Sequence, residues 1–176
     1  MNFTQIAELR QSCRRYHADR AVEQEKLDAI LCAARLAPSA CNGQPYHISI
    51  CTGDVAKQVA KATEGLGINQ FVEQAPVLLV ISERPCVVLP GLESRLEEND
   101  WRSIDIGILA AYITAEATEQ ELGSCIVGSF DGQRIREICH LDAPARLVIT
   151  IGYPADGVRL RAKRRKELSE LCDVIQ

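Results

Sequence analysis

Apolar residues recur along this chain at helical spacing in some segments and at strand spacing in others. Helical spacing predicts helices over 4–9, 22–36, 54–63, 101–122 and 131–140. Strand patterns predict extended segments over 46–52, 77–81, 125–127 and 146–151, and the second of these is apolar at every position, as in a strand covered on both faces. Because helices separate these strands, we expect a three-layer mixed sheet rather than a helical bundle or a sandwich of two sheets.

Polar and conformationally special residues mark the ends of these helices. Thr4, Asp54 and Asp131 precede or open helical patterns and are predicted N-caps. Pro38 ends the second helix, and Gly123 suits the C-terminal cap of the longest helix. Residues 83–100 contain prolines, a glycine and many charges, so we expect an irregular, substrate-covering segment there.

Length and composition indicate one folding unit over residues 1–176, with 47% hydrophobic and 25% charged residues. The longest uncharged apolar run, 75–82, is too short to cross a bilayer, and the first ten residues have no signal-peptide hydrophobic segment. We therefore expect a cytoplasmic protein without a membrane partner. The formal net charge of −4 argues against general nucleic-acid binding.

Eight cysteines include no Cys-x-x-Cys pair, which disfavours a metal site or a disulfide framework. Most lie inside apolar runs, where a reduced cysteine serves as a small hydrophobic side chain. Cys41 alone lies in a loop with the composition of a binding site.

Two basic segments could surround a phosphate. In an extended chain, Arg10, Ser12 and Arg14 share one side, and so do residues 159, 161, 163 and 165. Paired guanidinium groups suit a phosphate dianion, although a solvated basic surface or a nucleic-acid contact would have the same composition. The chain has neither a G-x-G-x-x-G after a strand nor a P-loop, so a different phosphate-binding device is needed.

The segment LAPSACNGQPYH, residues 36–47, combines small residues with side-chain amides and a hydroxyl. Such a loop could follow the edge of a flat heteroaromatic ring, although Ser, Asn and Gly are also ordinary loop formers.

Taken in order, these segments resemble the nitroreductase family of FMN-dependent oxidoreductases over most of the chain. The family's R-x-S-x-R/K-x-F/Y motif is matched from Arg10 to Tyr16, and A-P-S-x-x-N-x-Q-P-W/Y is matched from Ala37 to Tyr46. Later motifs resemble Asp105-Ile106-Gly107, the segment 122–131, and 151–154 followed by Lys163 and Arg165. The resemblance implies these cofactor contacts: Arg10, Gln11, Ser12, Arg14, Pro38, Ser39, Ala40, Asn42, Gln44, Asn69, Val127, Gly128, Ser129, Lys163 and Arg165.

The same resemblance implies an α+β sandwich with a mainly antiparallel sheet, an intertwined homodimer, and FMN at its interface. It implies hydride transfer from NAD(P)H by a ping-pong mechanism to an electron-poor acceptor such as a nitroaromatic, a quinone or an activated alkene. No single catalytic side chain and no metal are expected. The alternative is a flavin-binding sensor or store without turnover. Compared with many members, the chain has a reduced segment between Ser82 and Asp105 and an abbreviated C-terminal arm.

Overall fold

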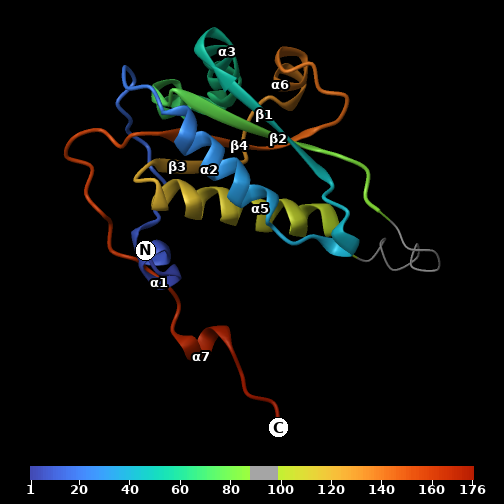
Figure 1. The fold of residues 1–176 in the computed structure, drawn as a ribbon. Helices are drawn as coiled ribbons and strands as arrows, with labels where there is room; N and C mark the ends of the chain where they lie inside the picture. Colours follow the sequence, from blue (N-terminus) through green and yellow to red (C-terminus); the bar gives the residue numbers. More distant parts are fainter. Residues whose placement is uncertain (88–98) are drawn as a thin grey trace.

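The structure, a computed structural model, describes residues 1–87 and 99–176. Its centre is a four-stranded sheet in the order β1-β2-β4-β3 (Figure 1). The strands are β1 (Tyr46–Thr52), β2 (Val77–Glu83), β3 (Gly123–Val127) and β4 (Ala145–Gly152). All three pairings between these strands are antiparallel. Within the described ranges, parallel pairing is limited to an isolated bridge between Ser12 and Ser124.

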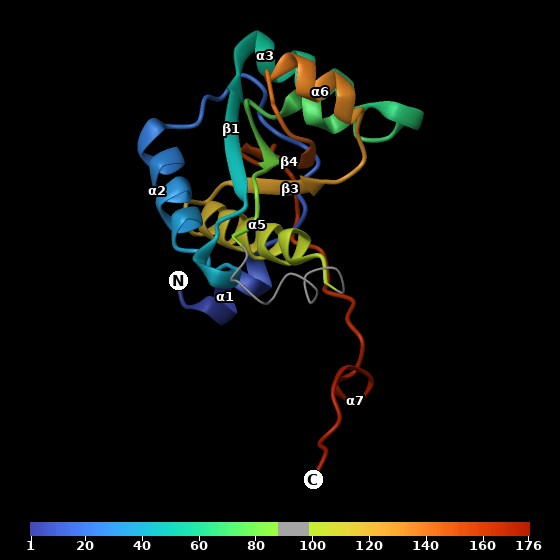
Figure 2. The same cartoon turned by 90° about the vertical axis from the view of Figure 1, so that its right-hand side faces the viewer.

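Helices cover both faces of the sheet, which confirms the three-layer α+β arrangement (Figures 1 and 2). On one face lie α2 (Gln24–Arg35) and the long α5 (Trp101–Glu119). On the other lie α3 (Gly53–Thr63) and α6 (Gly132–Ile138). The short helix α1 (Phe3–Leu9) packs near α5, while α7 (Leu168–Leu171) lies away from the sheet. Three short 3-10 turns cover Ala40–Asn42, Gly65–Gly67 and Gln70–Gln74.

The alternation of strand side chains divides the core into two layers. Along β2, Leu79 and Ile81 pack under α2 and α5, whereas Leu78 and Val80 pack under α3 and α6. All four side chains are fully buried. The uninterrupted apolar pattern of this strand follows from its burial on both faces.

The N-terminal caps of two helices differ from those expected. Asn2, not Thr4, caps α1, because its side chain accepts from the Gln5 amide and Gln5 reaches back to the Asn2 amide. Helix α3 begins at Gly53, so Asp54 lies inside its first turn, where it pairs with Lys57 at 3.0 Å.

The third predicted N-cap is confirmed. The Asp131 carboxylate accepts a 2.9 Å hydrogen bond from the Arg134 amide at the start of α6.

Gly123 opens β3 rather than capping α5. Helix α5 ends at Glu119 with Gln120 as its C-cap, and the left-handed residue beyond the cap is Glu121, with φ of 62°. Gly123 is required for a different reason: a Cβ atom there would lie 2.8 Å from the Cys13 side chain. The glycine thus allows the N-terminal segment to lie directly against the start of β3.

The C-terminal segment leaves the body of the molecule. Residues 159–176 are all exposed, and Figures 1 and 2 both show this stretch extending away from the sheet with α7 near its end. Most of the predicted covering segment, 88–98, lies outside the described residues. Among the described helices, none has the length and apolar character needed to span a membrane.

Candidate functional site

The N-terminal basic segment lies along the edge of β3. The Cys13 amide donates to the Ser124 carbonyl at 2.8 Å, and Tyr16 forms a second bridge with Pro154. The segment has no helix and only isolated bridges, so it meets the condition under which Arg10, Ser12 and Arg14 were expected to share one side, and it lies at the sheet edge without forming a regular strand. This placement holds Arg10, Ser12 and Arg14 next to the start of β3.

The buried side chain of Tyr16 links this segment to β4. Its hydroxyl group donates to the Cys13 carbonyl at 2.9 Å and lies 2.6 Å from Thr150 Oγ1 on β4. Burial strongly raises the pKa of Tyr16, so the phenol remains protonated and uncharged. The tyrosine at the end of the arginine-rich motif is thus a structural support for that motif.

The C-terminal basic segment returns to the same place. The Gln11 side chain donates to the Arg159 carbonyl and accepts from the Arg161 amide, both at 3.2 Å. The Arg161 guanidinium donates to the Ser12 carbonyl, and the Lys163 ammonium donates to the Arg10 carbonyl. Two segments about 150 residues apart are thereby joined by side-chain contacts.

We call Arg10, Arg14, Arg161, Lys163 and Arg165 the cationic cluster. Partial desolvation and the neighbouring charges of Arg10, Arg165 and Arg161 lower the pKa of Lys163. Within 1–87 and 99–176, no carboxylate forms an ion pair with any member of the cluster. A cavity of about 220 Å³ lies between the two segments, lined in part by Ser12, Arg14 and Arg161. Such an array can bind a compact dianion such as a phosphate monoester.

A second group of expected site residues forms the turn after α2. Cys41, Asn42 and Gln44 have positive φ values of 52°, 51° and 47°. The Ser39 hydroxyl accepts from the Gln44 amide at 3.0 Å, and the Gln44 side chain donates to the Asn42 carbonyl at 3.0 Å. These bonds hold the exposed Asn42 and Gln44 in a strained, tightly bonded turn.

Asp105 fixes this turn to α5. Its carboxylate is 3% exposed and accepts from the Ala40 amide, with distances of 3.1 and 3.2 Å to the two oxygens. A buried carboxylate needs such a donor, and here the donor belongs to the turn. Pro38 is exposed at the entrance to the turn.

A third group lies at the far end of β3. Asn69 has φ of 66°, and its side-chain amide donates to the carbonyls of Thr63 and Ser129 at 3.2 and 3.1 Å. Val127 is buried at the end of the strand, whereas Gly128 is exposed and a Cβ atom there would meet nothing within 4 Å. The surface beside Gly128 is therefore open, and Asn69 supports the backbone next to it.

The turn and the cationic cluster lie at opposite ends of α5 (Figure 1). Asp105, which holds the turn, lies near the first residue of this 19-residue helix. Ser124, which pairs with the N-terminal basic segment, lies shortly after its last residue. A helix of that length spans roughly 28 Å at about 1.5 Å per residue. The structure therefore brings the phosphate-type donors together, but it does not bring residues 38–44 to them within one chain.

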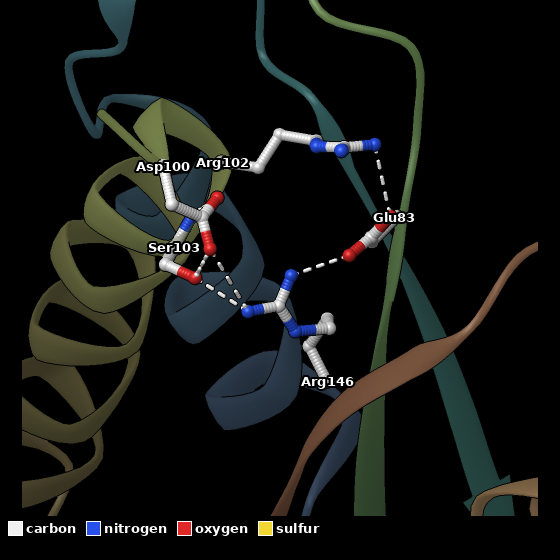
Figure 3. Close-up of polar contacts among 5 residues, drawn as sticks. All are labelled: Glu83, Asp100, Arg102, Ser103 and Arg146. Carbon is white, nitrogen blue, oxygen red and sulfur yellow. Dashed lines mark hydrogen bonds and ion pairs between the residues drawn. The ribbon is translucent and has the colours of Figure 1, made fainter. Parts of the chain in front are cut away.

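An ionic network joins the two ends of the segment that was expected to cover a substrate (Figure 3). Arg146 at the start of β4 pairs with Glu83 at the end of β2 and lies 3.5 Å from Asp100 before α5. Arg102 also pairs with Glu83, at 3.0 Å. The hydrogen bond to Glu83 raises the pKa of Arg146, so the guanidinium group stays protonated and positively charged. Residues 88–98 lie outside the described residues.

Two residues important to this geometry were not among the expected cofactor contacts. Arg161 was recognisable from its place in the alternating basic run, on the same side as Lys163 and Arg165. Asp105 was recognisable as an acidic residue between two isoleucines of an apolar helix, a position that requires a buried partner.

A sequence model described as Nitroreductase family matches residues 7–67 and 55–153. The chain belongs to the nitroreductase family. The matched residues include the N-terminal basic segment, the turn after α2 and all four strands, so family membership accounts for the main body of the fold.

Individual relatives and solved structures are similar to this chain over most of their length. A curated NADH dehydrogenase of Thermus thermophilus is 30% identical over 175 residues, covering 84% of this chain and 84% of the relative. The structure of a nitroreductase family protein from Clostridium difficile 630 has 28% identity and a TM-score of 0.79, covering 98% of both chains. The structure of an FMN-dependent nitroreductase from Clostridium difficile R20291 has 28% identity and a TM-score of 0.73, covering 91% of this chain and 92% of that one.

Proposed function

We propose that this chain is an FMN-dependent NAD(P)H oxidoreductase that reduces an electron-poor acceptor such as a nitroaromatic, a quinone or an activated alkene. We further propose that it has a single domain and acts as a homodimer in the cytoplasm. Family membership and a relative described as an FMN-dependent nitroreductase support the flavin and the class of reaction. The strongest structural support is the cationic cluster, in which residues from both ends of the chain converge on one cavity.

The described residues fit the phosphate of FMN. The cationic cluster offers several guanidinium groups, an ammonium group and the Ser12 hydroxyl, and no described carboxylate neutralises them by an ion pair. Uncompensated positive charges repel one another, and a bound dianion would remove that repulsion. We assign Arg10, Ser12, Arg14, Lys163 and Arg165 to the phosphate, with Gln11 and Arg161 holding the two segments together.

We assign the open surface beside Gly128 to the flavin ring, with Val127, Ser129 and Asn69 shaping it. When bound, FMN would supply the redox chemistry: it would take a hydride from NAD(P)H and pass the electrons to the acceptor in a ping-pong cycle. The chain's own contribution is to hold the cofactor, to leave one side of the ring accessible, and to keep the support under it rigid through the bonds of Asn69 to Thr63 and Ser129.

The separation of the turn from the cationic cluster supports a homodimer. If Pro38, Ser39, Ala40, Asn42 and Gln44 also contact FMN, they must contact the cofactor held by a second copy, because α5 keeps them too far from their own cluster. Helix α5 also leaves an apolar stripe uncovered, with Ile104 47% and Tyr112 39% exposed and Ala111 exposed between them. A stripe of this kind on the central helix suits an interface with a second copy.

The test is a visible absorption spectrum of the purified protein, reconstituted with FMN, before and after anaerobic addition of NADH or NADPH. We expect a flavin spectrum that is bleached by at least one nucleotide and is restored by a nitroaromatic or a quinone. A flavin that stays oxidised with both nucleotides would favour a flavin-binding sensor or store. A protein that stays colourless after incubation with FMN would overturn the cofactor assignment.

A further inference from the structure

Two cysteines that are distant in sequence meet between the sheet and α6. Cys51 lies near the end of β1, and Cys139 directly follows the last residue of α6. Their Sγ atoms lie 3.7 Å apart. Cys51 is 3% exposed, whereas Cys139 is partly exposed and offers a route from solvent to the pair.

The fold around the pair keeps the two sulfurs together. Cys51 belongs to the core layer under α3 and α6, and Ile138, Cys139 and Leu141 pack against the same layer. The Cys139 amide donates to the Ile135 carbonyl at 2.9 Å, which fixes the backbone at the end of α6. A disulfide bond is about 2.0 Å long, so the sulfurs need to approach each other by only about 1.7 Å.

We infer that Cys51 and Cys139 form a redox-reactive pair that closes to an intramolecular disulfide when the protein meets hydrogen peroxide. The inference rests on this geometry and is independent of the proposed flavin chemistry.

The partly exposed Cys139 is the sulfur that meets the oxidant. Its thiolate attacks one peroxide oxygen, the O–O bond breaks, and the departing hydroxide takes up a proton to become water, leaving a sulfenic acid on Cys139. The Cys51 sulfur then attacks the Cys139 sulfur and loses its proton, while the S–O bond breaks and a second water leaves. Two thiols are thereby oxidised by two electrons, and one peroxide is reduced to two waters.

Electrostatics agree with this order of events. The side-chain contact with Cys51 lowers the pKa of the Cys139 thiol, which favours the nucleophilic thiolate there. The same contact, together with burial, raises the pKa of Cys51. Cys51 is thus suited to the second step, in which it resolves the sulfenic acid.

Closing the disulfide would attach the edge strand β1 to the C-terminal end of α6, a helix that packs against α3 and β4. Among the described strands, β1 pairs only with β2, so one of its edges is unsupported by the sheet. A covalent link between β1 and the end of α6 constrains the unfolded chain over a long loop. We therefore expect the oxidised protein to melt at a higher temperature than the reduced protein.

The experiment uses full-length protein that has been reduced, freed of reductant, and treated with stoichiometric hydrogen peroxide. Digestion without reductant and mass spectrometry should find a Cys51–Cys139 cross-linked peptide pair, about 2 Da lighter than the two reduced peptides combined. The cross-link should be absent from Cys139→Ala, in which Cys51 should stay reduced. It should persist in Cys32→Ala, a control at an exposed cysteine of α2.

Cys51→Ala separates the two chemical steps. In this variant Cys139 should accumulate as a sulfenic acid that dimedone traps, because the resolving thiol is missing. The inference is overturned if the wild-type protein oxidises at the exposed Cys32 and Cys172 without forming the Cys51–Cys139 cross-link. It is also overturned if Cys139→Ala shows the same thermal shift on oxidation as the wild-type protein.

Discussion

Asp105 is a single buried carboxylate on which the turn after α2 depends. Replacing it by alanine leaves the Ala40 amide without its acceptor and removes a charge-assisted hydrogen bond, at a cost of about 1.5–3 kcal/mol. We expect Asp105→Ala to lower the free energy of unfolding by that amount and to weaken FMN binding by loosening residues 39–44. Urea denaturation and FMN titration measure the two effects.

The matched control is Asp54→Ala, which removes an exposed carboxylate whose ion pair with Lys57 lies at the surface of α3. This change should cost less than about 1 kcal/mol and leave FMN affinity unchanged. If the two variants are equally stable, the bond between Asp105 and Ala40 is not important for the fold.

Arg14 allows a phosphate role to be distinguished from a general role in folding. Its guanidinium is exposed and lies 5.9 Å from the Phe71 ring. Arg14→Gln should bind FMN roughly 10- to 100-fold more weakly than the wild-type protein, because it loses a charge-assisted hydrogen bond to the phosphate. Riboflavin, which has no phosphate, should bind both proteins equally, as fluorescence titration can measure.

Arg35→Gln, in the last turn of α2, is the control because this arginine is exposed and is not among the residues assigned to the cofactor. It should bind FMN like the wild-type protein. An equal loss of FMN and riboflavin affinity in Arg14→Gln would contradict the assignment of Arg14 to the phosphate.

At the scale of elements, the start of α5 depends on the ionisation of Asp100. Its carboxylate accepts from the Ser103 hydroxyl and from the Ser103 amide, and these bonds lower the pKa of Asp100. A lowered folded-state pKa gives stability that is fully present above the ordinary pKa of aspartate, about 4, and is lost as the pH falls through the lower folded-state value.

We therefore expect Asp100→Ala to melt below the wild-type protein at neutral pH, and the difference to disappear as the pH falls below the ordinary pKa of aspartate and through the lower folded-state value. Thermal unfolding followed by circular dichroism across this range is the measurement. Asp19→Ala, at an exposed position before α2, is the control and should follow the wild-type curve. A difference that is constant with pH would mean that the carboxylate charge does not stabilise α5.

Element types could be predicted from the sequence more reliably than element ends. The sequence of β1 alternates and the apolar run of β2 is uninterrupted, so both strands were recognisable from local pattern alone. The cap at Thr4 was wrong because Asn2 and Gln5 form a reciprocal pair that stabilises an earlier start. Gly123 was misread because its close approach to Cys13 is a tertiary contact.

The candidate site follows the same division. The alternation of Arg10, Ser12 and Arg14 predicted a shared side, and the sequence motifs assigned Lys163 to the same phosphate. The contacts that join these segments, through Gln11 and Arg161, depend on a chain reversal that no local pattern encodes. The role of Asp105 likewise depends on how α5 packs against the turn, which is known only once the layers are assembled.

At the scale of the whole molecule, the described residues of a single chain leave two surfaces exposed to solvent. The apolar stripe of α5 is exposed, and residues 159–176 extend from the body with Leu168, Leu171 and Ile175 exposed (Figure 2). Burying such surfaces against a second copy would recover the hydrophobic free energy that the isolated chain does not realise. Because this stripe lies on the central helix, we expect α5 to supply the central part of the interface.

Ala111→Glu tests this arrangement, because it places a charge in the middle of the stripe at a position already exposed in the single chain. The monomer fold should be preserved, whereas burying an unpaired carboxylate in a dimer interface is strongly unfavourable. We expect analytical ultracentrifugation to find a dimer for the wild-type protein and a monomer for Ala111→Glu. We expect the monomer to lose FMN affinity, because the turn at 38–44 would no longer reach a partner's cofactor.

Ile50→Glu is the control, at an apolar residue of β1 that is 45% exposed. It introduces the same charge outside α5 and should remain a dimer with bound flavin. A dimeric Ala111→Glu protein that keeps its FMN would mean that the exposed stripe of α5 is not the interface.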